Sequence, residues 1–295
     1  KVVAGDKART ALIGDNDQTI YSWRGSDPSI MSHMYSENFS DVKTLGLSKT
    51  YRYGHELALA SSYCINHNKN RLPNVCVAQN GSRETTINIH PTHDEGKVAA
   101  DIIQDKIEKQ GVKLQDIAIL CRLYSSSAPV ELALLEKGIP TYLTGGRSVL
   151  LSKEAMLIRS ILTLASGGYK KASQKDRVTL VESMMKLPSM SVKHTDIEKI
   201  AKNVAAKDSG IGFHINHFKP DGLSKFQSVK ISDRSFAISA IEKSMPNDKA
   251  HKLIQEFAKT TNLMEGVGKG SLTKKGAIES EDILASLISF IKRLD

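Results

Sequence analysis

Length, composition and charge exclude several classes of protein before any motif is considered. The chain has 295 residues, of which 40% are hydrophobic and 25% charged, which is typical of a globular chain of two or three domains. No apolar run approaches the length of a membrane span. The net charge of +9 suits a polyanionic partner such as nucleic acid, although a basic protein without such a partner can carry the same charge.

Cysteine usage and the two ends of the chain add further limits. The three cysteines, Cys64, Cys76 and Cys121, lie far apart and show no C-x-x-C spacing. This pattern argues against a disulfide framework or a zinc site and predicts a reducing cytoplasm as the location. The N-terminus has no Met and no signal pattern, and the C-terminus stops inside a predicted helix. We therefore expect the sequence to be an internal piece of a longer protein.

The first half of the chain alternates predicted strands and helices. Apolar runs and alternating patterns predict strands at 11–13, 43–47, 86–90, 117–120 and 141–143. Helical spacing predicts helices at 27–39, 55–66 and 130–137, and a further helix that starts at a capping box of Thr92 and Glu95 and ends at Gly111. This order of elements predicts a parallel α/β layer.

The pattern changes after Gly146, where strand signals nearly vanish. Helical stripes occur at 156–164, 178–185, 197–204 and 283–294. Thr195 and Glu198 form a second capping box, and Ser280 is expected to cap the last helix. The segment 262–280 is rich in Gly, Ser and Lys, which predicts a loop. Residues from about 147 onward are therefore expected to form a mostly helical domain.

The segment 14–25 is the most informative about function, because it follows a predicted strand at a place where α/β folds hold ligands. It reads Gly-Asp-Asn-Asp-Gln-Thr-Ile-Tyr-Ser-Trp-Arg-Gly. Gln18 can sense a terminal phosphate or hold a water, and Arg24 can bind a backbone phosphate. Tyr21 and Trp23 offer flat faces for bases, at roughly 1–3 kcal/mol per base. The alternative is that Trp23, the only tryptophan, is a core residue and that Gln18 and Arg24 are surface groups.

This segment resembles the motif G-D-x-D-Q-[ST]-I-Y-x-W-R-G of UvrD/Rep/PcrA-type superfamily 1 DNA helicases, and it matches every fixed position. The resemblance implies that Gln18 contacts the γ-phosphate of ATP and the attacking water. It also implies that Tyr21 and Trp23 stack on bases of single-stranded DNA. Arg24 would contact the DNA or its neighbouring loop.

A second segment, Leu-Ser-Lys-Thr-Tyr-Arg at 47–52, resembles the L-x-x-N-Y-R-S motif of the same family. The resemblance implies that Tyr51 stacks on the adenine ring and that Arg52 acts as an arginine finger on the γ-phosphate. Thr50 and Tyr53 depart from the usual residues, but neither change removes the ring or the guanidinium. Without the family motif, Tyr51 and Arg52 would be interpreted as a surface pair.

A third match covers 117–122, the helix before Gly138 and the glycine pair at 145–146, which resemble the second motor domain of these helicases. Here Arg122 would lie near the DNA backbone, with a solvated strand-end charge as the alternative. Tyr124 stands where relatives often have Asn. Residues 187–192 stand where relatives carry a Gly-Ile-Gly hairpin that can hold duplex phosphates. Serine permits close backbone approach less well than glycine, which argues against duplex binding there.

The resemblance implies an α/β fold built from pieces of RecA-like, parallel-sheet motor domains and a mostly helical inserted domain. Residues 1–40 would be the tail of the first motor domain (1A), 41–146 the first part of the second (2A), and 147–295 an incomplete inserted domain (2B). The parent would be an ATP-dependent DNA helicase that moves 3′ to 5′ with ATP and Mg²⁺. Its partners would be single-stranded DNA and single-strand/duplex junctions, with repair or replication proteins as further candidates.

Two features are missing from the sequence and two other functions remain open. There is no G-x-x-x-x-G-K-[ST] loop and no Asp-Glu magnesium pair before the first motif, so both are expected upstream and the chain alone is expected not to hydrolyse ATP. The helicase subunit of a RecB- or AddA-like nuclease shares these motifs. A non-catalytic DNA-binding module would keep the stacking loop without a motor.

Overall fold

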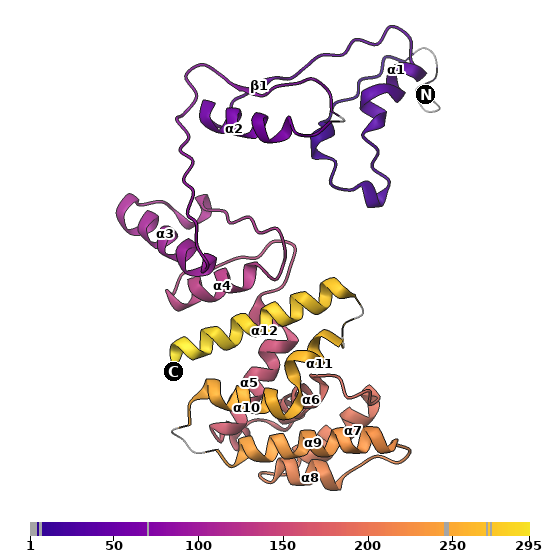
Figure 1. Ribbon diagram of the computed structural model, residues 1–295, viewed down its shortest axis with the longest axis vertical. Helices are drawn as coiled ribbons and strands as arrows, with labels where there is room; N and C mark the ends of the chain where they lie inside the picture. The colour runs from indigo at the N-terminus through magenta and orange to yellow at the C-terminus, as the bar shows by residue number, and fades with distance from the viewer. Residues whose placement is uncertain (1–4, 6–7, 70, 245–247, 270, 272) are drawn as a thin grey trace. The chain divides into compact units, whose positions relative to one another are not determined.

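The computed structural model describes residues 5, 8–69, 71–244, 248–269, 271 and 273–295 (Figure 1). Contacts within the chain divide it into two compact units, Lys1–Pro91 and Thr92–Asp295. Helices dominate the second unit, whereas the first contains short helices, turns and one small sheet. The division into motor and inserted domains at residues 40 and 146 stays a prediction.

The first unit is organised around a helix and a two-stranded parallel sheet. Its elements are 3-10 turns at Asn16–Gln18 and Ser22–Arg24, a π-helical turn at Ile30–Met34, α1 (Tyr35–Asn38), β1 (Lys49–Thr50), α2 (His55–Ile65) and β2 (Val77–Ala78). Lys49 pairs with Val77 and Thr50 with Ala78. The α2 helix lies against β2, where the Ser62 hydroxyl donates a hydrogen bond of 3.1 Å to the Cys76 carbonyl. The predicted helix at 55–66 is therefore confirmed.

The strands predicted at 11–13, 43–47, 86–90, 117–120 and 141–143 are wrong, because the structure shows no strand at any of them. Sheet formation is not local, since each strand needs a hydrogen-bonded neighbour and a covered apolar face. Both are missing here: Ile89 is 84% exposed and Leu120 is 95% exposed. The parallel direction of pairing is observed only between β1 and β2 in the described part of the chain.

The second unit begins with two helices that pack together, α3 (Glu95–Gln110) and α4 (Ser127–Glu136). Their small core consists of Ala100, Ile103, Val130, Ala133 and Leu134. The predicted capping box of α3 is wrong, because Asp94 is the N-cap and its carboxylate accepts from the Lys97 N–H at 3.0 Å. Gly111 ends α3 in the left-handed conformation, φ 64°, as its position predicts.

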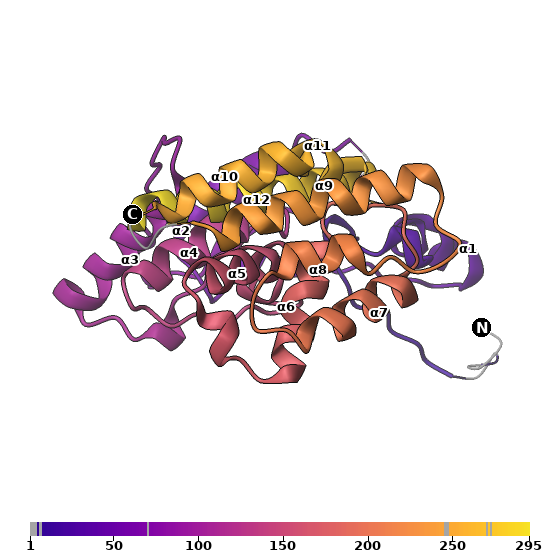
Figure 2. The same cartoon turned by 90° about the horizontal axis from the view of Figure 1, so that it is seen from below.

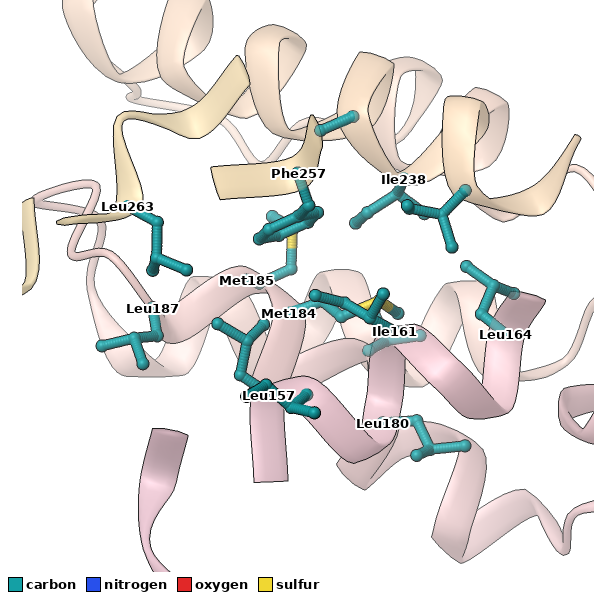
Figure 3. Close-up of a cluster of buried hydrophobic side chains, with 14 of the residues drawn as sticks. Leu157, Ile161, Leu164, Leu180, Met184, Met185, Leu187, Ile238, Phe257 and Leu263 are labelled. Atoms are coloured by element: carbon teal, nitrogen blue, oxygen red, sulfur yellow. The ribbon is translucent and has the colours of Figure 1, made fainter. Parts of the chain in front are cut away.

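A helical bundle makes up the rest of the second unit (Figure 2). Its helices are α5 (Lys153–Ala165), α6 (Gln174–Lys186), α7 (His194–Ala205), α8 (Ile211–His217), α9 (Lys225–Glu242), α10 (Ala250–Thr261), α11 (Leu263–Lys269) and α12 (Lys274–Leu294). The α5 helix is central, with contacts to α6, α9, α10 and α12. Its apolar stripe meets the Met184–Met185 pair of α6 and Phe257 of α10 in one buried cluster (Figure 3). The prediction of a mostly helical region is confirmed.

Several details of this bundle differ from expectation. The predicted loop at 262–280 is wrong, because α11 and the first turns of α12 occupy most of it. Ser280 is buried inside α12, and Thr273 caps that helix by accepting from the Gly276 N–H at 3.0 Å. Thr195 lies within α7, whose N-cap Lys193 makes no side-chain cap, so the second predicted box is also wrong. No helix among the described residues is long and apolar enough to cross a membrane.

Close packing of α8 on α9 depends on Gly212, and this gives a stability prediction. A Cβ placed there would lie 2.2 Å from the Ser239 Oγ and 2.3 Å from the Ser235 carbonyl oxygen. We expect Gly212→Ala to lower the free energy of unfolding by about 1–3 kcal/mol, because the helices must separate. Chemical denaturation followed by circular dichroism measures this change. As a control, Gly168→Ala should cost less, since its nearest neighbour lies 3.3 Å away; equal costs would contradict the packing explanation.

Candidate functional site

The loop 14–25 is shaped by its own acidic residues. Asp15 is the N-cap of the first 3-10 turn, and its carboxylate accepts from the Asp17 N–H at 3.0 Å. The same carboxylate accepts from the Gln18 side-chain amide at 2.6 Å. Gln18 is therefore tied to its own loop while it stays exposed, and its second amide N–H and its Oε1 remain available for a phosphate or a water.

The aromatic part of the loop faces solvent. Trp23 is 73% exposed and Tyr21 50% exposed, with ring centroids 6.4 Å apart and planes inclined at 58°. The Arg24 guanidinium lies 4.5 Å from the Trp23 ring centroid and 5.5 Å from that of Tyr21. This exposure does not fit the interpretation of Trp23 as a core residue. Two rings and a cation on one turn form a surface that can stack on bases and contact phosphate.

The end of the loop is fixed by its backbone. The Arg24 and Ser26 N–H groups both donate to the Tyr21 carbonyl, at 2.8 and 3.2 Å. Gly25 takes the left-handed conformation, φ 91°, which glycine adopts without strain. Hydrogen bonds from Ser29 lower the pKa of Asp27, so this carboxylate stays charged at the start of the following helical segment.

A residue that the sequence did not single out anchors the loop. The Arg71 guanidinium binds the Asp17 carboxylate through Nε (3.1 Å) and Nη2 (2.9 Å) to Oδ2. It also donates to the Asn66 Oδ1 and the Asn74 carbonyl, each at 2.8 Å. The partners Asp17 and Arg71 are 54 positions apart, so no local pattern could have revealed the contact.

The second motif lies at β1. Thr50 is buried and its hydroxyl accepts from the Arg52 N–H at 3.3 Å, so this departure from the family motif fixes the local backbone. The ring of Tyr51 is 76% exposed. Arg52 is exposed, and its side chain has no hydrogen bond or ion pair among the residues that the structure describes. Both groups are therefore free to contact a ligand. The Tyr53 hydroxyl instead lies 3.5 Å from the Cys76 Sγ.

The third motif belongs to the unit Thr92–Asp295. Arg122 is exposed, in agreement with either a DNA contact or a solvated charge. The Tyr124 hydroxyl donates to the Arg147 carbonyl. Burial, with the nearby Glu131 carboxylate, raises the pKa of Tyr124, so the phenol keeps its proton. The predicted roles of Gln18, Tyr51, Arg52, Tyr21, Trp23, Arg24 and Arg122 remain predictions.

Two polar side chains hydrogen-bond to the backbone of the segment 187–192. Arg234, buried in α9, donates to the carbonyls of Leu187 (2.7 Å) and Pro188 (2.9 Å), and Gln227 donates to the Ser191 carbonyl at 2.6 Å. Ser191 has a φ of 56°, a conformation that glycine adopts more easily. A Gly-Ile-Gly tripeptide does occur elsewhere, at 210–212. Its first two N–H groups are occupied by the Glu242 carboxylate, at 2.5 and 2.8 Å.

No group of three or more His, Cys, Asp or Glu side chains among the described residues could hold a metal ion. The exposed ring of Tyr51 and the exposed guanidinium of Arg52 are adjacent on the chain, which fits part of a nucleotide site.

Comparison with known proteins gives two family matches and a set of relatives. Residues 1–38 match the UvrD/REP helicase N-terminal domain, and residues 45–292 match the UvrD-like helicase C-terminal domain. The ATP-dependent DNA helicase PcrA of Staphylococcus aureus is 23% identical over 294 residues, and that of Staphylococcus epidermidis is 24% identical over 299. In both cases the match covers 99% of this chain and 38% of the relative.

Proposed function

Because the chain belongs to the UvrD-like helicase family, we propose that the protein containing it is an ATP-dependent DNA helicase that translocates 3′ to 5′ on single-stranded DNA and unwinds duplex. The curated relatives are ATP-dependent DNA helicases by name. The observation that carries the proposal is the solvent-exposed Tyr21–Trp23 pair beside Arg24, on a loop that also holds Gln18.

Under this proposal, the residues of the first two motifs act on the nucleotide. ATP with its Mg²⁺ would supply the phosphoanhydride that is cleaved. Tyr51 offers its exposed ring to the adenine, and Arg52 offers an unpaired guanidinium to the charge that develops on the γ-phosphate. Gln18, whose Nε2 donates to Asp15, orients the attacking water through its remaining amide groups.

The loop 14–25 would couple the nucleotide to the DNA strand, because Gln18 and the aromatic pair are separated by only a few residues. A shift of Gln18 on binding or releasing a phosphate is transmitted along this short backbone to Tyr21 and Trp23. Bases stacked on those rings would then move with the loop. In the proposed arrangement, residues 1–40 and 41–146 are pieces of two RecA-like motor domains, and their closure on ATP ratchets the stack along DNA.

Removing the Trp23 ring tests the proposal on the full-length protein. We expect Trp23→Ala to weaken binding of labelled oligo-dT by roughly 1–3 kcal/mol, because one stacking platform is lost. Fluorescence anisotropy measures the affinity. Thermal stability should change little, since a ring that is 73% exposed contributes little packing.

A matched control is Tyr63→Ala, which removes another exposed ring, 70% accessible, from the same unit but outside the loop. Its affinity for oligo-dT should equal that of the unmodified protein. The proposal fails if Trp23→Ala binds oligo-dT normally. A loss of about 3–5 kcal/mol of folding stability would instead identify Trp23 as a core residue.

A further inference from the structure

The ion pair between Asp17 and Arg71 is more buried and has more hydrogen bonds than an ordinary surface pair. The two side chains are 20% and 12% exposed, and two nitrogens of the guanidinium bind one carboxylate. By contrast, the pair of Lys109 and Asp105 on α3 is 74% and 44% exposed. Exposed pairs of that kind contribute little, whereas a bidentate, partly buried arginine pair fixes geometry.

Arg71 is itself held in place from both sides. Asn66, the C-cap of α2, accepts from Nη1, and the Asn74 carbonyl accepts from Nη2. The Asn74 carbonyl lies just before β2, whose Val77 N–H donates to the Ser48 carbonyl at 2.8 Å. The guanidinium is therefore joined through a few hydrogen bonds to β1, next to the segment that carries Arg52.

On its other side, Arg71 controls the loop that carries Gln18. Asp17 precedes Gln18 directly, and both bind the same Asp15 carboxylate, one through its backbone N–H and the other through its side-chain amide. Any displacement of Asp17 moves the backbone of Gln18. A continuous set of contacts thus runs from Gln18 through Asp17, Arg71 and Asn74 to β1.

We propose that Arg71 is a positioning residue for ATP hydrolysis, and that the Asp17–Arg71 clamp keeps Gln18 in register with Arg52. The inference rests on the proposed function, because Gln18 and Arg52 must act on the same phosphate. Arginine is required at this position, because lysine cannot bind Asp17 in a bidentate manner and also reach Asn66 and Asn74. All the hydrogen bonds of the Arg71 guanidinium go to protein groups, so in this proposal it acts through Gln18.

The test compares Arg71→Ala with the unmodified full-length protein. We expect kcat for DNA-stimulated ATP hydrolysis to fall by about 10–100-fold, because Gln18 loses its alignment. The KM for ATP should stay within about twofold, because the exposed ring of Tyr51, which would stack on the adenine, is left unchanged. Hydrogen exchange of peptides covering 15–25 should become faster, since the loop loses its anchor. Arg71→Lys should recover only part of kcat.

Arg177→Ala is the matched control. Arg177 is also 12% exposed, binds Asp208 at 2.7 Å and donates to the carbonyls of Lys170 and Ala172, but it lies in the helical bundle. The Arg177→Ala variant should keep the kcat of the unmodified protein and the same rate of hydrogen exchange in peptides covering 15–25. The inference is overturned if Arg71→Ala keeps full kcat, if exchange of 15–25 does not change, or if Arg177→Ala has the same effects. An unmodified protein without ATPase activity would refute the proposed function, and the exchange measurement would still decide whether the clamp holds the loop.

Discussion

Replacing Arg52 by alanine in the full-length protein is expected to lower kcat for ATP hydrolysis by about 10³-fold or more, the usual scale for an arginine finger. The exposed guanidinium has no partner among the described residues, so its loss disturbs no structural contact. Affinity for single-stranded DNA without nucleotide should hardly change. Steady-state ATPase assays at saturating oligo-dT, with anisotropy measured in parallel, separate the two effects.

Arg83→Ala is a suitable control for this experiment, because Arg83 is also exposed in the first unit and has no predicted role. Its kcat should match that of the unmodified protein. If Arg52→Ala turns over ATP at the normal rate, Arg52 is only a surface charge. The pairing of Tyr51 and Arg52 with a nucleotide would then have no support beyond the motif.

Helices could be predicted from the sequence because their signals are local. The apolar stripes of α2, α5, α6 and α7 each lie within a single segment, and all four helices form where the spacing predicts them. Their exact starts were harder to predict, because several side chains near a helix start can act as the cap. Asp94 acts as the cap of α3 in place of Thr92, whose hydroxyl instead accepts from the Asp94 N–H.

The sheet could not be predicted in the same way, because strands need partners. Among the described residues of the first unit, Ala58 is the only hydrophobic side chain that is buried. Apolar segments such as the one containing Ile89 therefore have no core to pack against, and they form no strand.

In the candidate site, too, local sequence identifies some residues, whereas others are identified only by the fold. The motif residues from Gln18 to Arg24 could be named from sequence, because they follow one another on one loop. Arg71 could not, because its contact with Asp17 depends on the fold. The role of Glu242 could not be predicted from the sequence either. Its carboxylate, at the end of α9, accepts hydrogen bonds from the Gly210 and Ile211 N–H groups at the start of α8.

The buried guanidinium of Arg234 gives the largest expected effect on stability. It donates to the carbonyls of Met184, Leu187 and Pro188, and its Cζ lies 5.5 Å from the ring centroid of Phe257. Burial lowers the pKa of Arg234 to about 9, which still leaves it protonated at neutral pH. The side chain therefore joins α9 to the end of α6 through charge-assisted hydrogen bonds in a place that water does not reach.

We expect Arg234→Met to lower the free energy of unfolding by roughly 3–5 kcal/mol, because methionine fills the volume but leaves buried carbonyls without donors. Unfolding of the helices by urea, monitored by circular dichroism, measures the loss of unfolding free energy. Lys225 is an exposed cation on the same helix, and Lys225→Ala should change the free energy of unfolding by less than about 0.5 kcal/mol. A cost below about 1 kcal/mol for Arg234→Met would mean that water or a rearranged backbone satisfies those carbonyls, so that the segment 187–192 keeps its shape without Arg234.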